Sequence, residues 1–195
     1  MSNFEGHEAS NAFSEALNCI GRENDRGAVL VSAALLDSKL EGLIKEKLLP
    51  SSEKNDPMFS GGNAPLSTFS AKIEFSFRLG LIRNETRKAL NDFRRLRNDF
   101  AHGYNAVNFD EPQIKNRINS IFKRHKDILS ALEDDLKRYY REMHQDGSED
   151  TFFDRHWPIR KTFDLIFAGH VMALERVRLE VEPLIPLESD NDGGE

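Results

Sequence analysis

The sequence predicts an all-α fold, a single-domain helical bundle of about six or seven helices. Several stretches place apolar residues three and four positions apart, the spacing that keeps side chains on one face of a helix. No stretch sustains the alternation of apolar and polar residues that is typical of a half-buried strand. At 195 residues the chain is long enough for one good core and too short for two large domains. We expect one helical domain over residues 1–187 and a disordered acidic tail over residues 188–195.

The first two helices are indicated by apolar spacing and by the residues at their ends. A short helix is expected from about residue 4 to residue 18, stopping near Gly21. Asn24 or Asp25 is suited to cap a longer second helix, which Pro50 ends. The apolar positions of this second helix repeat at three and four residues: Val29, Leu36, Leu40, Leu43 and Ile44.

A long connection follows the second helix. Residues 50–65 contain three prolines and two glycines, so they predict a loop. A connection of this length inside a compact domain is usually functional or mobile. Both interpretations stay open, and mobility is the one that we favour.

Two helices in the middle of the chain are predicted to pack as a hairpin. Ser67 or Thr68 begins the first of them, and the hydrophobic corner 79–82 closes it. Asn84 is suited to cap the next helix, which runs to His102. The connection is so short that the two helices should lie against each other.

The last part of the chain predicts further helices. A turn region covers residues 104–110, and Pro112 lies near a helix start. Apolar spacing then indicates one or two helices reaching Tyr140, and a final helix over about residues 159–181.

Composition narrows the classes of function. No run of about 18 apolar residues exists and no secretory signal is recognisable, so we expect a cytoplasmic protein. The net charge of −6 argues against a nucleic-acid binder that works by overall attraction. The single cysteine, Cys19, excludes a cysteine-based zinc site, and the histidines lack the spacing of metal ligands. We therefore expect no metal site and no cofactor.

The segment 93–103 concentrates the candidate chemistry. Its helix carries an apolar stripe: Leu90, Phe93, Leu96 and Phe100. Arg97 falls between two of these positions, so it borders or joins the buried face and is expected to need a partner. His102 sits at the expected helix end, where Gly103 is suited to the position after the cap.

Four polar residues repeat along the same helix at i, i+4, i+7 and i+11: Arg87, Asn91, Arg94 and Asn98. Arginine and asparagine suit phosphates and base edges. The corner before this helix also has the outline of a helix-turn-helix. A polar helix face is more often simply solvated, and the acidic net charge favours that interpretation. Together with Arg97 and His102, these four are the candidate binding residues.

Residues 64–114, roughly a quarter of the chain, resemble the bacterial mannitol operon repressor family. The features that carry the resemblance follow one another in the order Ala64-Pro65-Leu66-Ser67, Leu79-Gly80-Leu81-Ile82, Arg97-Asn98-Asp99-Phe100-Ala101-His102 and Asn108-Phe109-Asp110-Glu111. The resemblance implies a helical transcriptional regulator of the repressor type. It does not identify an operon or an inducer.

The arrangement of Arg97 and His102, with four residues between them, is similar to the signature of HEPN domains. These domains are helical bundles that often dimerise. The similarity therefore implies a bundle and a homodimer. In the ribonucleases of that group, two copies of the motif meet across the dimer and cut RNA without metal.

Three interpretations of Arg97 and His102 stay open. In the first, which we favour, they lock the helix end: Arg97 pairs with an acidic residue of another helix and His102 caps carbonyls. In the second, they contact a ligand or nucleic acid. In the third, His102 is the general acid or base of a ribonuclease and Arg97 holds the scissile phosphate.

For the whole chain we expect a repressor-like regulator of transcription. It would act by binding a protein or nucleic-acid partner, without catalysis. The alternative is a HEPN-type, metal-independent endoribonuclease.

Overall fold

The computed structural model describes residues 7–102, 108–124 and 158–187. These residues contain six helices and no strand, which confirms the predicted all-α fold. The helices are α1 (His7–Gly21), α2 (Asp25–Lys47), α3 (Phe69–Arg78), α4 (Asn84–His102), α5 (Pro112–Arg124) and α8 (Ile159–Glu180). Among them, no helix is both long and apolar enough to cross a membrane.

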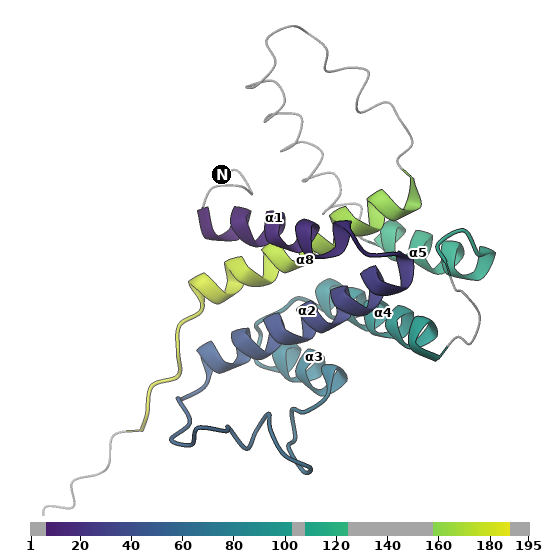
Figure 1. Ribbon diagram of the computed structural model, residues 1–195. Coiled ribbons are helices and arrows are strands. Elements are labelled where there is room, and N and C mark those ends of the chain that lie inside the picture. Colours follow the sequence, from purple (N-terminus) through teal and green to yellow (C-terminus); the bar gives the residue numbers. More distant parts are fainter. Residues whose placement is uncertain (1–6, 103–107, 125–157, 188–195) are drawn as a thin grey trace, which may run out of the picture.

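Helix α2 lies at the centre of the bundle, where α1, α3, α4 and α8 all pack against it. Helix α8 also packs along α1 and touches α5, and α5 in turn contacts α4. Figure 1 shows α1 and α8 side by side, above α2, α3 and α4. These five helices thus form two layers: α1 and α8 make one layer, and α2, α3 and α4 make the other.

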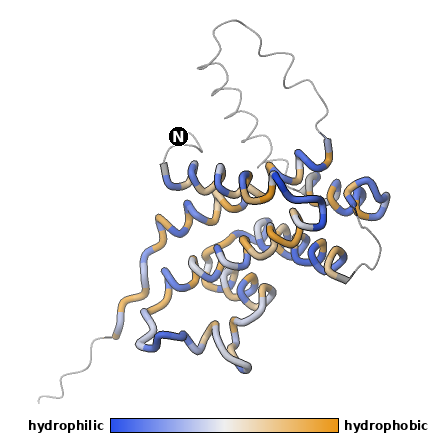
Figure 2. The backbone as a smooth tube through the Cα atoms, viewed as in Figure 1, coloured by the Kyte–Doolittle hydropathy of each residue, from blue (hydrophilic) through white to orange (hydrophobic). Residues whose placement is uncertain are grey.

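A chain of aromatic rings fills the core between these layers. Phe93 of α4 and Phe109 both contact Phe163 of α8, with ring centroids 5.8 and 5.0 Å apart. Phe100 meets Phe109 edge to face at 5.8 Å. The predicted apolar stripe of α4 is therefore buried, as expected. Figure 2 shows apolar and hydrophilic residues alternating along each helix, as burial of one face requires.

Two of the predicted helix caps are present. The Asn24 side chain accepts a hydrogen bond from the backbone N–H of Gly27 at 2.8 Å, and so caps α2. The Thr68 hydroxyl accepts one from the N–H of Ala71 at 3.2 Å, and so caps α3. Asn84, which was predicted to cap α4, is instead its first helical residue.

The hydrophobic corner after α3 is a Schellman motif. Gly80 has a φ of +71°, a left-handed conformation that favours glycine. The N–H of Leu81 donates to the carbonyl of Ser76, and that of Gly80 to Phe77, both at 3.0 Å. The turn directs the chain into α4, which packs against α3 as the predicted hairpin.

The predicted loop between α2 and α3 packs on the core through two apolar side chains. Phe59 and Leu66 are only 7% and 4% exposed. The N–H of Leu66 donates to the carbonyl of Met58 at 2.9 Å. The Lys45 ammonium lies 4.8 Å from the centroid of the Phe59 ring. Composition predicted the loop but not these two apolar anchors.

The later helices begin where the sequence predicted. Helix α5 starts at Pro112, and α8 covers the range expected for the final helix. Asn108 accepts hydrogen bonds from the N–H groups of Asp110 and Glu111, at 3.0 and 3.2 Å. Gly103, the helices expected between residues 125 and 140, and the tail 188–195 lie outside the described residues.

Candidate functional site

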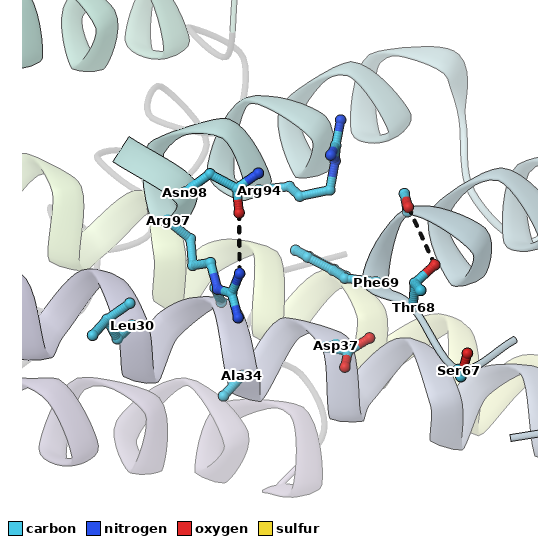
Figure 3. Close-up of a pocket in the computed structure, with 11 residues that line it drawn as sticks. Leu30, Ala34, Asp37, Ser67, Thr68, Phe69, Arg94, Arg97 and Asn98 are labelled. Carbon is cyan, nitrogen blue, oxygen red and sulfur yellow. Dashed lines mark hydrogen bonds between the residues drawn. The ribbon is translucent and has the colours of Figure 1, made fainter. Parts of the chain in front are cut away.

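A cavity of about 660 Å³ opens between α2, the start of α3 and the second half of α4 (Figure 3). Three of the six predicted binding residues line it. The complete lining is Leu30, Ala33, Ala34 and Asp37 from α2, Ser67, Thr68, Phe69 and Ser70 around the start of α3, and Arg94, Arg97 and Asn98 from α4.

Arg97 is exposed and borders the buried face of α4 rather than joining it; the sequence leaves both positions open. Its Nη1 donates to the side-chain oxygen of Asn98 at 3.1 Å. No acidic side chain in the described part of the chain pairs with it. Figure 3 shows the Arg97 side chain reaching from α4 toward α2, close to Ala34. The salt bridge expected from a structural lock is thus missing among these residues, and the guanidinium faces the cavity instead.

Arg94 and Asn91 belong to a short chain of hydrogen bonds along α4. Arg94 donates through Nε to the Asn91 side chain at 3.4 Å, and Asn91 donates to the carbonyl of Arg87 at 3.0 Å. In Figure 3 the guanidinium of Arg94 points away from α2. The predicted polar face exists, but Asn91 is bound to the backbone of its own helix.

Arg87 lies at a second, smaller hollow of about 230 Å³, which Asn91 also lines. Its Nη1 forms an ion pair with Glu74 of α3 at 3.2 Å. Its guanidinium also stacks over the ring of Phe77 at 4.2 Å. The predicted binding residues are therefore divided between the two hollows. Arg94, Arg97 and Asn98 line the larger one, and Arg87 and Asn91 line the smaller one.

His102 is the last residue of α4, as predicted, but its side chain lies outside the described residues. Asp99, which precedes it by three residues, forms an ion pair with Arg117 of α5. This carboxylate is therefore engaged with α5.

The start of α3 presents polar groups to the cavity. The Thr68 hydroxyl caps the helix and lies 3.2 Å from the Ser70 hydroxyl. The N–H groups of Phe69 and Ser70 belong to the first turn, where no intrahelical acceptor exists. Figure 3 places the Phe69 ring between this helix start and α4.

Asp37 brings a negative charge to the α2 wall, and a buried lysine balances it. Lys72 of α3 is 4% exposed, and its ammonium lies 3.1 Å from Asp37 and 2.8 Å from Glu41. Burial lowers the pKa of Lys72, but the hydrogen bond to Glu41 and the ion pair with Asp37 outweigh burial and hold the pKa above its usual value. Lys72 thus stays charged and fixes α3 against α2.

Several residues of the cavity were not singled out from the sequence, among them Asp37 and Phe69. Thr68 was recognised only as the start of a helix. These residues precede Arg97 by about 30 to 60 positions, and helical spacing connects only residues within one helix. Only the packing of α3 and α4 on α2 brings them to one cavity.

Metal ligands do not gather in the described part of the chain. No group of three or more histidine, cysteine, aspartate or glutamate side chains is placed there to hold an ion.

Comparison with known proteins identifies a likeness in fold. No protein-family model and no curated protein sequence matches the chain. Among solved structures, the chain is similar to one in the X-ray structure of the MtlR-HPr complex from Escherichia coli. The TM-score is 0.53 at 15% sequence identity, and the match covers 84% of this chain and 98% of the other. The likeness supports an MtlR-like fold, in agreement with the fold implied by the resemblance to mannitol operon repressors.

Proposed function

We propose that this chain is a regulatory protein that acts by binding a protein partner, without catalysis. The observation that carries the proposal is the likeness in fold, over 84% of the chain, to a chain in a protein–protein complex. The finer role is that of a repressor-like regulator of transcription, which the resemblance in residues 64–114 implies. Of the six predicted binding residues on α4, the contact set proposed for the protein partner is Arg94, Arg97, Asn98 and His102, because Arg87 and Asn91 are engaged within the chain.

The engagement of the α4 side chains favours a protein partner over DNA. A recognition helix needs side chains that are free to reach base edges. Arg87 is instead held by Glu74 and Phe77 of α3, and Asn91 bonds to the backbone of its own helix. The net charge of −6 opposes approach to a polyanion as well.

Calorimetric titration of the purified chain with HPr from the organism that encodes this chain tests the proposal. We expect saturable binding, weakened at least tenfold by the double substitution R94E/R97E. R83E is the matched control, because Arg83 is exposed and lies just before α4, about 20 Å from Arg97 in the direction of the helix axis. Absence of HPr binding, together with a DNA shift at 150 mM salt (about physiological ionic strength), would overturn the proposal.

The ribonuclease alternative requires a separate measurement. Labelled RNA is incubated with the chain in chelator, beside R97A and H102A variants whose folding is checked by circular dichroism. We expect no cleavage by any of the three proteins. Cleavage by the parent chain that both folded variants lose would establish the catalytic alternative instead.

We also propose that the chain forms a homodimer, as the similarity to HEPN domains implies. Exposed large apolar side chains at the end of α8 and just after it support an interface: Leu179, Leu184, Ile185 and Leu187. Light scattering coupled to size exclusion should give twice the chain mass of 22.3 kDa. A single-chain mass at all concentrations up to about 100 μM would exclude a dimer with a Kd of micromolar order or tighter.

A further inference from the structure

We propose that the cavity between α2, α3 and α4 binds a small organic oxyanion, namely a carboxylate or phosphate monoester joined to a compact apolar body. This site goes beyond the proposed function and does not depend on it. The volume of about 660 Å³ lies within the range of small-molecule sites.

Arg97 supplies the group that holds the oxyanion. A guanidinium has five N–H donors. Among the described residues, the Arg97 side chain makes one hydrogen bond, to the Asn98 side chain at 3.1 Å, and no carboxylate pairs with it. Arg97 lines the cavity, so its other donors are available to a ligand bound there. A planar carboxylate or phosphate matches this fork and forms charge-assisted hydrogen bonds with it.

The α2 wall supplies the apolar surface. Leu30, Ala33 and Ala34 line this side of the cavity, and the Phe69 ring stands opposite them at the start of α3. An inorganic anion would leave these surfaces hydrated. A ligand with an aliphatic or aromatic body would cover them and gain hydrophobic free energy.

Asp37 limits the ligand to one anionic group. Its carboxylate lines the same cavity, and Lys72 balances its charge from the buried side. A second anionic group near Asp37 would meet repulsion, whereas a hydroxyl there could bond to the carboxylate. The hydroxyls of Ser67 and Thr68 lie on this side too. The polar end opposite Arg97 therefore favours neutral, hydrogen-bonding groups.

Nuclear magnetic resonance on the ¹⁵N-labelled full chain tests the site without any protein partner. Phenyl phosphate and benzoate serve as the two oxyanion probes, with inorganic phosphate and benzyl alcohol as the fragments that each lack one half of the ligand. At least one probe should give saturable shifts confined to residues 30–37, 67–70 and 94–98. Each fragment should bind at least tenfold more weakly than that probe.

Two variants and one control complete the experiment. R97Q should weaken binding of the probe at least tenfold, and A34F should do the same by filling the apolar side, since both side chains are exposed and their replacement leaves the core intact. R83Q should bind like the parent chain. Shifts that stay unchanged in folded R97Q, shifts elsewhere on the surface, or no saturable shift with either probe would each overturn the proposal. Loss of HPr binding in the calorimetric experiment would not affect it.

Discussion

Arg160 of α8 forms an ion pair with Asp25 of α2, with Nη1 3.2 Å from Oδ1. The other carboxylate oxygen of Asp25 accepts a hydrogen bond from the N–H of Phe109 at 2.9 Å. Arg160 also donates through Nη2 to the carbonyl of Ile20 at 2.7 Å, at the end of α1. The side chains of Arg160 and Asp25 thus join the end of α1 and the segment before α5 to the first turns of α2 and α8.

Replacement of Arg160 by methionine should destabilise the bundle by about 2–3 kcal/mol. The substitution keeps an unbranched side chain but leaves Asp25 and the Ile20 carbonyl without their cationic donor. Urea unfolding followed by circular dichroism measures the change in the free energy of unfolding. K161M is the matched control, since Lys161 is exposed on the same turn. Equal stability of R160M and K161M would contradict a structural role for the network.

The Schellman turn after α3 predicts opposite effects for two glycine substitutions. G80A should cost about 1 kcal/mol, because φ is +71° at Gly80 and alanine is strained there. G42A should stabilise by about 0.5–1 kcal/mol, because Gly42 lies inside α2 and an added Cβ meets no atom within 4 Å. Thermal or urea unfolding of the two variants measures the change in the free energy of unfolding for each. A loss of stability in both variants would show that the effect is not one of backbone conformation.

Most of the fold could be predicted because its signals are local. Asn24 and Thr68 cap the helices that follow them, and the spacing of Phe93 and Phe100 identified the buried side of α4. Each signal depends on residues within a few positions of one another. The anchoring of the loop by Phe59 depends on the distant α2, and composition alone therefore favoured mobility.

The candidate site could be predicted only in part. Its α4 residues were found because Arg94 and Asn98 share one helix face. The exposure of Arg97 could not be predicted from the sequence. A residue at the border of an apolar stripe is buried only if a neighbouring element covers it. Here the start of α3 and the face of α2 leave a cavity beside that border. The position of Asp37 in the same cavity is likewise a result of tertiary packing.

Glu175 of α8 predicts how stability changes in acid. Burial raises the pKa of this carboxyl, but hydrogen bonds from Arg178 and Lys39, both 2.7 Å at their shortest, outweigh burial and hold the pKa below its usual value of 4.5. A depressed carboxyl pKa stabilises the fold above the unfolded pKa, and this stability is lost as the pH falls through the folded pKa. E175Q should therefore lower the free energy of unfolding by about 1–3 kcal/mol at pH 7.

The difference between E175Q and the parent chain should shrink as the pH falls below about 4.5, the usual carboxyl value. Urea unfolding at pH 7, 5, 4 and 3 measures this difference in the free energy of unfolding. E180Q is the control, because Glu180 is exposed in the next turn of α8. A difference that stays constant over this range would show that the lost packing of Glu175, and not its charge, explains the effect.

Lys72 predicts a link between the stability of the bundle and the proposed oxyanion site. K72M keeps the buried length of the side chain but removes the cation that lies 3.1 Å from Asp37. Glu41 retains Lys45 at 2.7 Å, whereas Asp37 keeps no cationic partner in the described part of the chain. The unbalanced carboxylate then repels an anion in the cavity. We expect a loss of about 2 kcal/mol in stability and at least threefold weaker binding of the oxyanion probe.

The double variant D37N/K72M separates charge balance from packing. If the effect of K72M comes from the unpaired Asp37 carboxylate, the added D37N substitution should recover part of the stability and most of the probe binding. A double-mutant cycle with D37N alone gives the coupling between the two side chains, which should reach about 1 kcal/mol. A coupling near zero would mean that Lys72 acts through packing alone. In that case the charge of Asp37 would not set the ligand preference of the cavity.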